Sequence, residues 1–133
     1  MLRGENISFS YSKDKDFIKN LNIDIPKGKV TTILGPNGSG KSTLLSILST
    51  YNKPSKGNVF IEDKNLNDLK SREIAKLIAT VHQHNESPED LSVETLISYG
   101  RTPHHKRYKS NKDENEEIIN WAIKSTNWED IRD

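Results

Sequence analysis

Alternating apolar and polar residues predict β-strands in the first part of the chain. Residues 7–11 (ISFSY) and 21–25 (LNIDI) alternate in this way, and the second run ends at a Pro-Lys-Gly turn. Such alternation is typical of strands with one buried face. Residues 30–34 (VTTIL) and 59–61 (VFI) are short apolar runs rich in β-branched side chains, which also favour strands.

Apolar residues at helical spacing predict helices in the rest of the chain. Residues 41–50 follow a glycine-rich segment, a second helix is capped by Ser71, and residues 93–99 and 113–128 form two more. Residues 79–81 read as a strand after the second helix. The apolar stripe of the last helix consists of Ile118, Ile119, Ala122 and Ile123.

Composition restricts the possible functions without selecting one. The chain has 133 residues, of which 32% are apolar and 29% charged, so a self-sufficient core is not assured. A net charge of +1 gives no overall attraction to nucleic acid, which we do not expect as a partner. The sequence has no cysteine and no run near the roughly 20 apolar residues of a membrane span, which fits a cytosolic protein.

The strongest chemical signal is the segment GPNGSGKST, residues 35–43, between a predicted strand and a predicted helix. Its glycines let backbone N–H groups wrap closely around phosphate oxygens at a helix N-terminus. Lys41 can reach the β- and γ-phosphates of a nucleotide, Ser42 offers a hydroxyl to Mg²⁺, and Thr43 lies nearer the α-phosphate. The predicted phosphate-binding residues are Gly35, Asn37, Gly38, Ser39, Gly40, Lys41, Ser42 and Thr43.

The run GPNGSGKSTLL resembles the nucleotide-binding segment of ATP-binding cassette (ABC) proteins. The resemblance implies that Tyr11 stacks on adenine, and that Gln83 is the family's glutamine, which ligates Mg²⁺ and senses the γ-phosphate. A strand-end core tyrosine and a plain surface glutamine are the alternatives for these two residues. His82 stands where the family more often has proline, which puts the rigidity of that loop in doubt.

The stretch SPEDLSVETLISYGRTPH, residues 87–104, is similar to the importer ATPases that serve iron–siderophore, haem and cobalamin uptake. The segments SREIAK and Tyr99–Gly100–Arg101 add to this likeness. The resemblance implies ATP-driven uptake of an iron–siderophore or related metal chelate, with ATP and Mg²⁺ as cofactors. It also implies a second ATPase subunit and a membrane permease that contacts residues 85–101, from Asn85 to Arg101, at the inner face of the membrane.

The fold implied is α/β, a P-loop NTPase (RecA-like) core with an N-terminal antiparallel β-subdomain. Residues 1–84 would hold that subdomain and the core, and residues 85–133 would begin the helical subdomain. Residues 59–63 (VFIED) match a strand of the antiparallel subdomain, so we assign them no catalytic role.

Three catalytic features of the family do not occur in this sequence: the L-S-G-G-Q signature, a strand ending in Asp-Glu, and a later switch histidine. We therefore expect an N-terminal portion, shortened by design or by a broken reading frame, that holds phosphates but hydrolyses ATP poorly. No complete set of catalytic residues is predicted, and Lys41 and Gln83 only position phosphate and metal. Missing strands and helices should also leave apolar surface exposed.

Other interpretations stay open at this point. The chain could be a noncatalytic nucleotide-binding or assembly module, or a cassette that works in export, DNA repair or translation. His82, His84, His104 and His105 could suggest a transition metal, but no cysteine or well-spaced carboxylate supports one. The basic loop at residues 101–112 is interpreted as a solvated loop because its charges are mixed with acidic neighbours.

Overall fold

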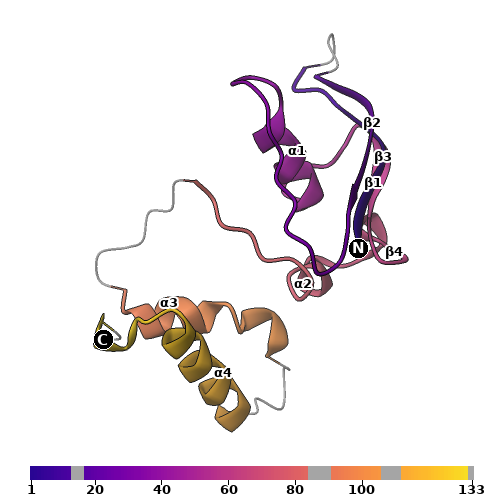
Figure 1. The fold of residues 1–133 in the computed structure, drawn as a ribbon. Coiled ribbons are helices and arrows are strands. Elements are labelled where there is room, and N and C mark those ends of the chain that lie inside the picture. Colours follow the sequence, from indigo (N-terminus) through magenta and orange to yellow (C-terminus); the bar gives the residue numbers. More distant parts are fainter. Residues whose placement is uncertain (13–16, 84–90, 106–111, 132–133) are drawn as a thin grey trace. The chain divides into compact units, whose positions relative to one another are not determined.

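The computed structural model describes residues 1–12, 17–83, 91–105 and 112–131. The first half of the chain contains a four-stranded antiparallel sheet (Figure 1). Its strands lie in the order β2-β1-β3-β4, and each neighbouring pair is antiparallel. The strands are β1 (Leu2–Phe9), β2 (Ile18–Ile25), β3 (Lys56–Ile61) and β4 (Lys64–Asn65). This confirms the predicted antiparallel subdomain and the place of VFI within it.

A bulge in β1 bends the central strand. The pairing of β1 shifts between Gly4 and Ile7 on the β2 side, and Asn6 has a φ of 51°. The N–H of Asn6 still has a hydrogen-bond partner, because it donates to Oδ1 of Asn22 at 2.9 Å. Across the strand, Gly57 has a φ of +86°, and a Cβ there would overlap the carbonyl oxygens of Glu5 and Asn6. The bulge and this glycine therefore depend on each other.

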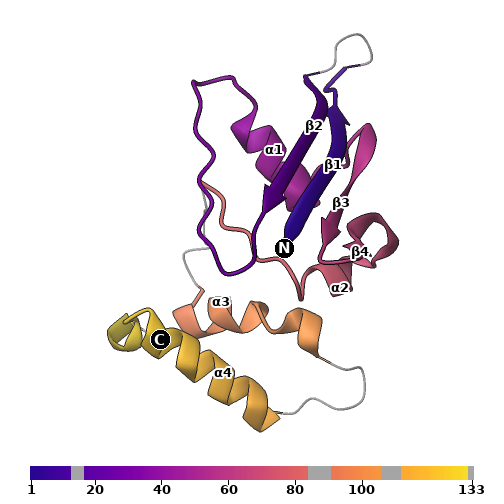
Figure 2. The same ribbon diagram turned by 45° about the vertical axis from the view of Figure 1, so that its right-hand side comes forward.

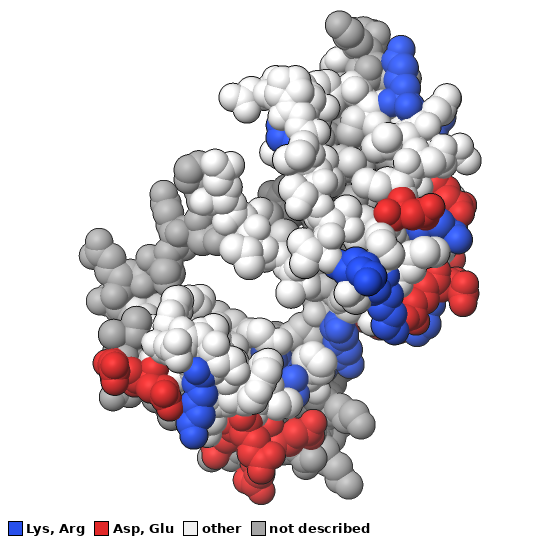
Figure 3. Space-filling view, viewed as in Figure 1, with Lys and Arg blue, Asp and Glu red and all other residues white. Residues whose placement is uncertain are grey.

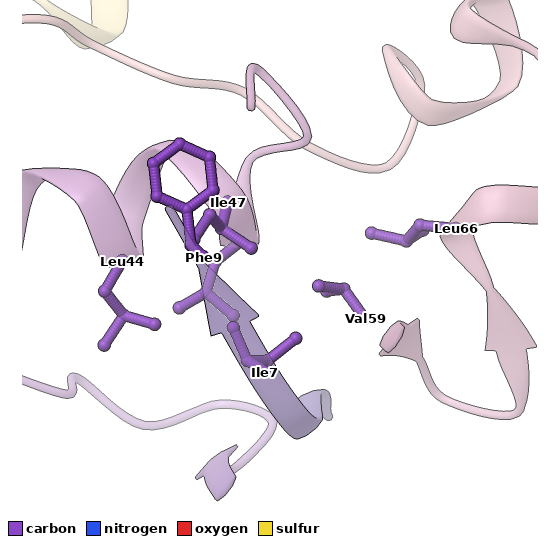
Figure 4. Close-up of a cluster of buried hydrophobic side chains, with 7 residues drawn as sticks. Ile7, Phe9, Leu44, Ile47, Val59 and Leu66 are labelled. Atoms are coloured by element: carbon purple, nitrogen blue, oxygen red, sulfur yellow. The ribbon is translucent and has the colours of Figure 1, made fainter. Parts of the chain in front are cut away.

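Helix α1 (Lys41–Leu48) covers one face of the sheet, as Figure 2 shows. Ile7 of β1 and Ile47 of α1 are fully buried between the two layers. The cluster around them is drawn in Figure 4 and comprises Ile7, Phe9, Leu44, Ile47, Leu48, Val59 and Leu66. The helix ends two residues earlier than predicted, because Thr50 takes a φ of 63° that does not continue a helix.

Two predicted strands are wrong, those at residues 30–34 and 79–81. Neither forms a strand, and the exposed fractions of Val30, Leu34 and Val81 are 97%, 85% and 88%. Ile33 alone of the first run packs against the core. A strand needs a neighbour that accepts and donates backbone hydrogen bonds, and no such neighbour pairs with these runs within the described residues. The exposed apolar surface expected from the sequence is present here.

The segment after the sheet contains η1 (Leu66–Asp68), a 3₁₀-helix, and then α2 (Ser71–Ile74). Ser71 is the first residue of α2 and not its cap, which corrects the prediction. Lys70 is the N-cap residue of α2, and its N–H donates to Oε2 of Glu73 at 2.9 Å. The chain divides into two compact units, Met1–Thr80 and Val81–Asp133, and the boundary in sequence lies just after this segment.

The second unit is helical, with α3 (Val93–Tyr99), η2 (Thr102–His104), α4 (Lys112–Ser125) and η3 (Glu129–Ile131). The predicted helices at 93–99 and 113–128 are confirmed, the second with shifted ends. Ser92 caps α3, because its Oγ accepts from the N–H of Thr95 at 3.3 Å. Helices α3 and α4 pack together, and Ile123 of the predicted stripe is buried. No helix among the described residues is long and apolar enough to span a membrane.

The close approach at Gly57 gives a stability prediction. Gly57→Ala should lower the free energy of unfolding, because it adds a positive-φ cost of about 1–2 kcal/mol and an overlap with β1 of about 1–3 kcal/mol. Gly28→Ala is the matched control, since Gly28 has a φ of +71° with nothing within 4 Å of the added Cβ. Urea unfolding of both variants measures the difference. Equal losses would contradict the packing role of Gly57.

Candidate functional site

The glycine-rich segment folds as a tight loop immediately before α1. Gly38 and Gly40 have φ values of 81° and 91°, in the left-handed region that favours glycine. A Cβ on Gly35 would lie 2.8 Å from Oγ of Ser39, so a larger residue there would require the Ser39 side chain to move. The N–H of Ser39 donates to the carbonyl of Pro36 at 3.2 Å, which closes the loop on itself. The backbone path of the loop thus favours glycine at positions 38 and 40.

The start of α1 favours an anion. Its first turn holds no acidic residue, and its first helical bond runs from the N–H of Leu44 to the carbonyl of Gly40 at 2.8 Å. The N–H groups of the preceding residues have no partner within the helix, as at every helix start, and carry the positive end of its dipole.

The surrounding stretch of chain is basic. Residues 25–61 contain no aspartate or glutamate, and their charged residues are Lys27, Lys29, Lys41, Lys53 and Lys56. In Figure 3 the acidic side chains of the first unit gather over the sheet and its turns, away from the place of α1 in Figure 1. A negatively charged group at the loop would therefore meet no carboxylate from residues 25–61.

One ion pair lies at the edge of this stretch. Nζ of Lys27 is 2.8 Å from Oε1 of Glu62, and this contact raises the pKa of Lys27 and lowers the pKa of Glu62. Both groups are exposed, so the pair is a weak surface contact. The pair therefore involves Lys27, which precedes the loop in the sequence. Lys41 does not take part in it and bonds to the loop instead.

Lys41 lies over the loop. Its Nζ donates to the carbonyl oxygens of Gly35 and Pro36, both at 2.8 Å. These bonds hold the ammonium group beside the loop N–H groups, where it adds a full positive charge to the same concave backbone. Ser42 is exposed beside it, so its hydroxyl oxygen is open to a ligand.

Tyr11 is brought to the first turn of α1 from 32 residues away. Its Oη lies 2.6 Å from Oγ1 of Thr43, which is buried. Its ring meets Phe9 at a centroid distance of 4.9 Å and Phe17 at 5.6 Å, both edge to face. Tyr11 itself is 67% exposed and lies beyond the end of β1, so it is not a core tyrosine. The structure thus joins Tyr11, Thr43 and the loop in one place.

Gln83 is exposed and belongs to the second compact unit, so its approach to the loop stays a prediction. Of the predicted permease contact, residues 91–101 are described, while residues 85–90 lie outside the described part. His84 and residues 106–111 of the basic loop lie outside it too. Within the described residues no group of three or more His, Asp or Glu side chains could hold a metal ion.

Phe17 is the residue at this site that the sequence reasoning missed. Its N–H donates to the carbonyl of Phe9 at 2.8 Å, which fixes it just before β2. Its Cε1 would lie 3.1 Å from a Cβ added to Gly40, so its ring edge packs against the loop. The available signal was an aromatic residue directly before β2, because β2 pairs with β1, the strand that precedes Tyr11.

Solved structures with the same fold include nucleotide-binding proteins. The chain matches a dimeric ATP-binding cassette in a post-hydrolysis state bound to ADP and Pi, with a TM-score of 0.78 and 26% identity, over 99% of this chain and 60% of that one. It matches a nucleotide-free cassette from an ABC transporter with a TM-score of 0.76 and 28% identity, over 100% of this chain and 56% of that one. The α/β cassette fold expected from the sequence is confirmed.

Sequence relatives are longer importer subunits. The iron(3+)-hydroxamate import ATP-binding protein FhuC of Bacillus subtilis is 40% identical, over 94% of this chain and 46% of its own length. The petrobactin import ATP-binding protein FpuC of Bacillus anthracis is 42% identical, over 84% and 41%. The ferric enterobactin transport ATP-binding protein FepC of Escherichia coli is 37% identical, over 94% and 46%. The chain spans about half the length of these curated relatives.

A family model agrees with these likenesses. The model described as ABC transporter matches residues 18–133, which is most of the chain and includes the loop and α1. The chain belongs to the ABC transporter family of ATP-binding cassettes.

Proposed function

We propose that this chain forms the nucleotide-binding part of an ATPase subunit that powers import of an iron–siderophore or related metal chelate. The observation that carries nucleotide binding is the glycine loop on α1 with Lys41 laid over it. The importer assignment rests on the relatives named above, whose printed functions are iron(3+)-hydroxamate, petrobactin and enterobactin transport. Cargo recognition belongs to other components, since the loop chemistry is specific for phosphates.

ATP would bind with its phosphates in the loop and its base toward Tyr11. The backbone N–H groups of the loop and the dipole of α1 hold the phosphate oxygens. Lys41 exchanges its bonds to loop carbonyls for bonds to the β- and γ-phosphates. Thr43, tied to Tyr11, lies nearer the α-phosphate. The proposed contacts are Tyr11, Gly35, Asn37, Gly38, Ser39, Gly40, Lys41, Ser42, Thr43 and Gln83.

Ser42 and Gln83 would hold Mg²⁺. The hydroxyl of Ser42 is exposed at the first turn of α1, and Gln83 is exposed at the start of the second unit. Both are neutral oxygen donors, which suit a hard cation that keeps several waters and also binds substrate phosphates. When bound, Mg²⁺ neutralises charge that develops on the phosphate oxygens. The protein's own task is to orient those oxygens toward the cation.

The other parts of the assembly follow from the family. Residues 1–84 would be the β-subdomain and nucleotide core, and residues 85–133 would begin a helical subdomain. Residues 85–101 would face a membrane permease, so the protein would lie at the cytoplasmic face of the membrane. A second ATPase subunit would complete the site. Because the signature, the Asp-Glu strand and the switch histidine are not in these 133 residues, the chain by itself would turn over ATP slowly.

Nucleotide binding should depend on the Lys41 ammonium. Lys41→Ala is expected to weaken Mg²⁺-dependent binding of a nonhydrolysable ATP analogue by about tenfold to a hundredfold, since charge-assisted hydrogen bonds contribute roughly 1.5–3 kcal/mol. Isothermal titration calorimetry of the unaltered chain and of Lys41→Ala measures how binding depends on Lys41. The same titrations with EDTA measure how it depends on Mg²⁺. Lys29→Ala is the matched control, because it removes the same charge from the same acid-free stretch outside the loop. Equal losses in both variants would show that only net charge matters.

Hydrolysis separates the importer ATPase from a noncatalytic nucleotide-binding module. ATP turnover by the protein in its membrane assembly, lost in Lys41→Ala, is the result expected of an ATPase. Binding without turnover in that assembly would support the noncatalytic module. Co-purification with a permease distinguishes import from DNA repair or translation.

A further inference from the structure

We propose that Phe17 is a second aromatic binding residue of the nucleotide site, in direct contact with the nucleoside part of the ligand. The inference rests on the proposed function, since it concerns the same loop. On the surface of the first unit, Tyr11 and Phe17 are neighbouring rings that are 67% and 46% exposed. Two large aromatic side chains left side by side in water mark a surface that a ligand covers.

The backbone holds Phe17 more firmly than its exposure suggests. Its N–H donates to the carbonyl of Phe9 at 2.8 Å, and the next residue, Ile18, pairs with Phe9 in the ladder between β1 and β2. The ring therefore projects from the end of a paired strand. The backbone of Phe17 is therefore already ordered before a planar ligand packs on its ring, which lowers the entropic cost of binding.

Phe17 lies against the phosphate loop itself. Its ring edge faces Gly40, the residue before Lys41, closely enough that a Cβ at Gly40 would be 3.1 Å from Cε1. Tyr11 faces Thr43 through the 2.6 Å contact between their hydroxyl oxygens. The two neighbouring rings thus both lie at the start of α1, where the sugar and base of a nucleotide would follow its phosphates.

The rings contact one another without flat stacking. Tyr11 meets Phe9 with an interplanar angle of 90° and Phe17 with an angle of 63°, so it stacks flat on neither. Both rings stay partly exposed, with no flat stacking between them. A nucleoside offers the flat, weakly polar surface that such rings bind, and no base-specific hydrogen bond is needed.

The test compares a ligand with a nucleoside to one without. Phe17→Ala and Phe17→Leu should each weaken binding of a nonhydrolysable ATP analogue to the full chain by about fivefold or more, while inorganic tripolyphosphate binds as before. Phe17→Leu keeps an apolar side chain on Gly40, so it carries the test if Phe17→Ala does not fold. Equal weakening of both ligands would overturn the proposal, because Phe17 would then only support the loop. Unchanged binding of the analogue would overturn it too.

A double-mutant cycle separates direct contact from positioning of Tyr11. In the Tyr11→Ala background, Phe17→Leu should still weaken binding of the analogue if Phe17 touches the nucleoside. If Phe17→Leu no longer weakens binding in that background, Phe17 acts only by positioning Tyr11. That result would refute direct contact with the nucleoside. Failure of the proposed function looks different: the unaltered chain would bind neither tripolyphosphate nor the analogue, or Lys41→Ala would bind both normally.

Discussion

The packing of α1 against the antiparallel sheet is the interaction on which the rest of the first unit depends. Ile7 and Ile47 are completely buried at its centre, and burial of such a side chain contributes roughly 1.5–3 kcal/mol. An eight-residue helix is too short to be stable in water by itself. The sheet therefore makes the helix, and the helix in turn fixes the glycine loop that precedes it.

This dependence explains how an apolar core positions a polar site. Leu44, Ile47 and Leu48 turn one face of α1 toward the sheet, which leaves the N–H groups of its first turn directed at the loop. Thr43 lies at the border: it is buried like its apolar neighbours, yet its hydroxyl meets that of Tyr11. The aromatic residues after β1 and before β2 are thus fixed to the same helix as the phosphate loop.

The sequence predicted most of what depends on local patterns. Alternation located β1 and β2, a short β-branched run located β3, spacing located α1, α3 and α4, and the motif located the glycine loop before α1. It was wrong where a strand needs a distant partner, because the β-branched residues at 30–34 favour an extended chain but cannot supply the neighbour that a sheet requires. It also missed Phe17, because only the pairing of β1 with β2 brings that ring to Gly40.

The two flanks of the glycine loop are held unequally, and this bears on how the loop responds to a ligand. On its C-terminal side α1 is anchored by several buried side chains, whereas on its N-terminal side Ile33 alone of residues 30–34 packs against the core. The carbonyl of Gly35, which accepts from Lys41, lies on the weakly held side. In the proposed mode of binding, Lys41 leaves that carbonyl for a phosphate, so the ligand would release the flank that is already least constrained. Little of the binding energy is then lost in deforming the packed side of the site.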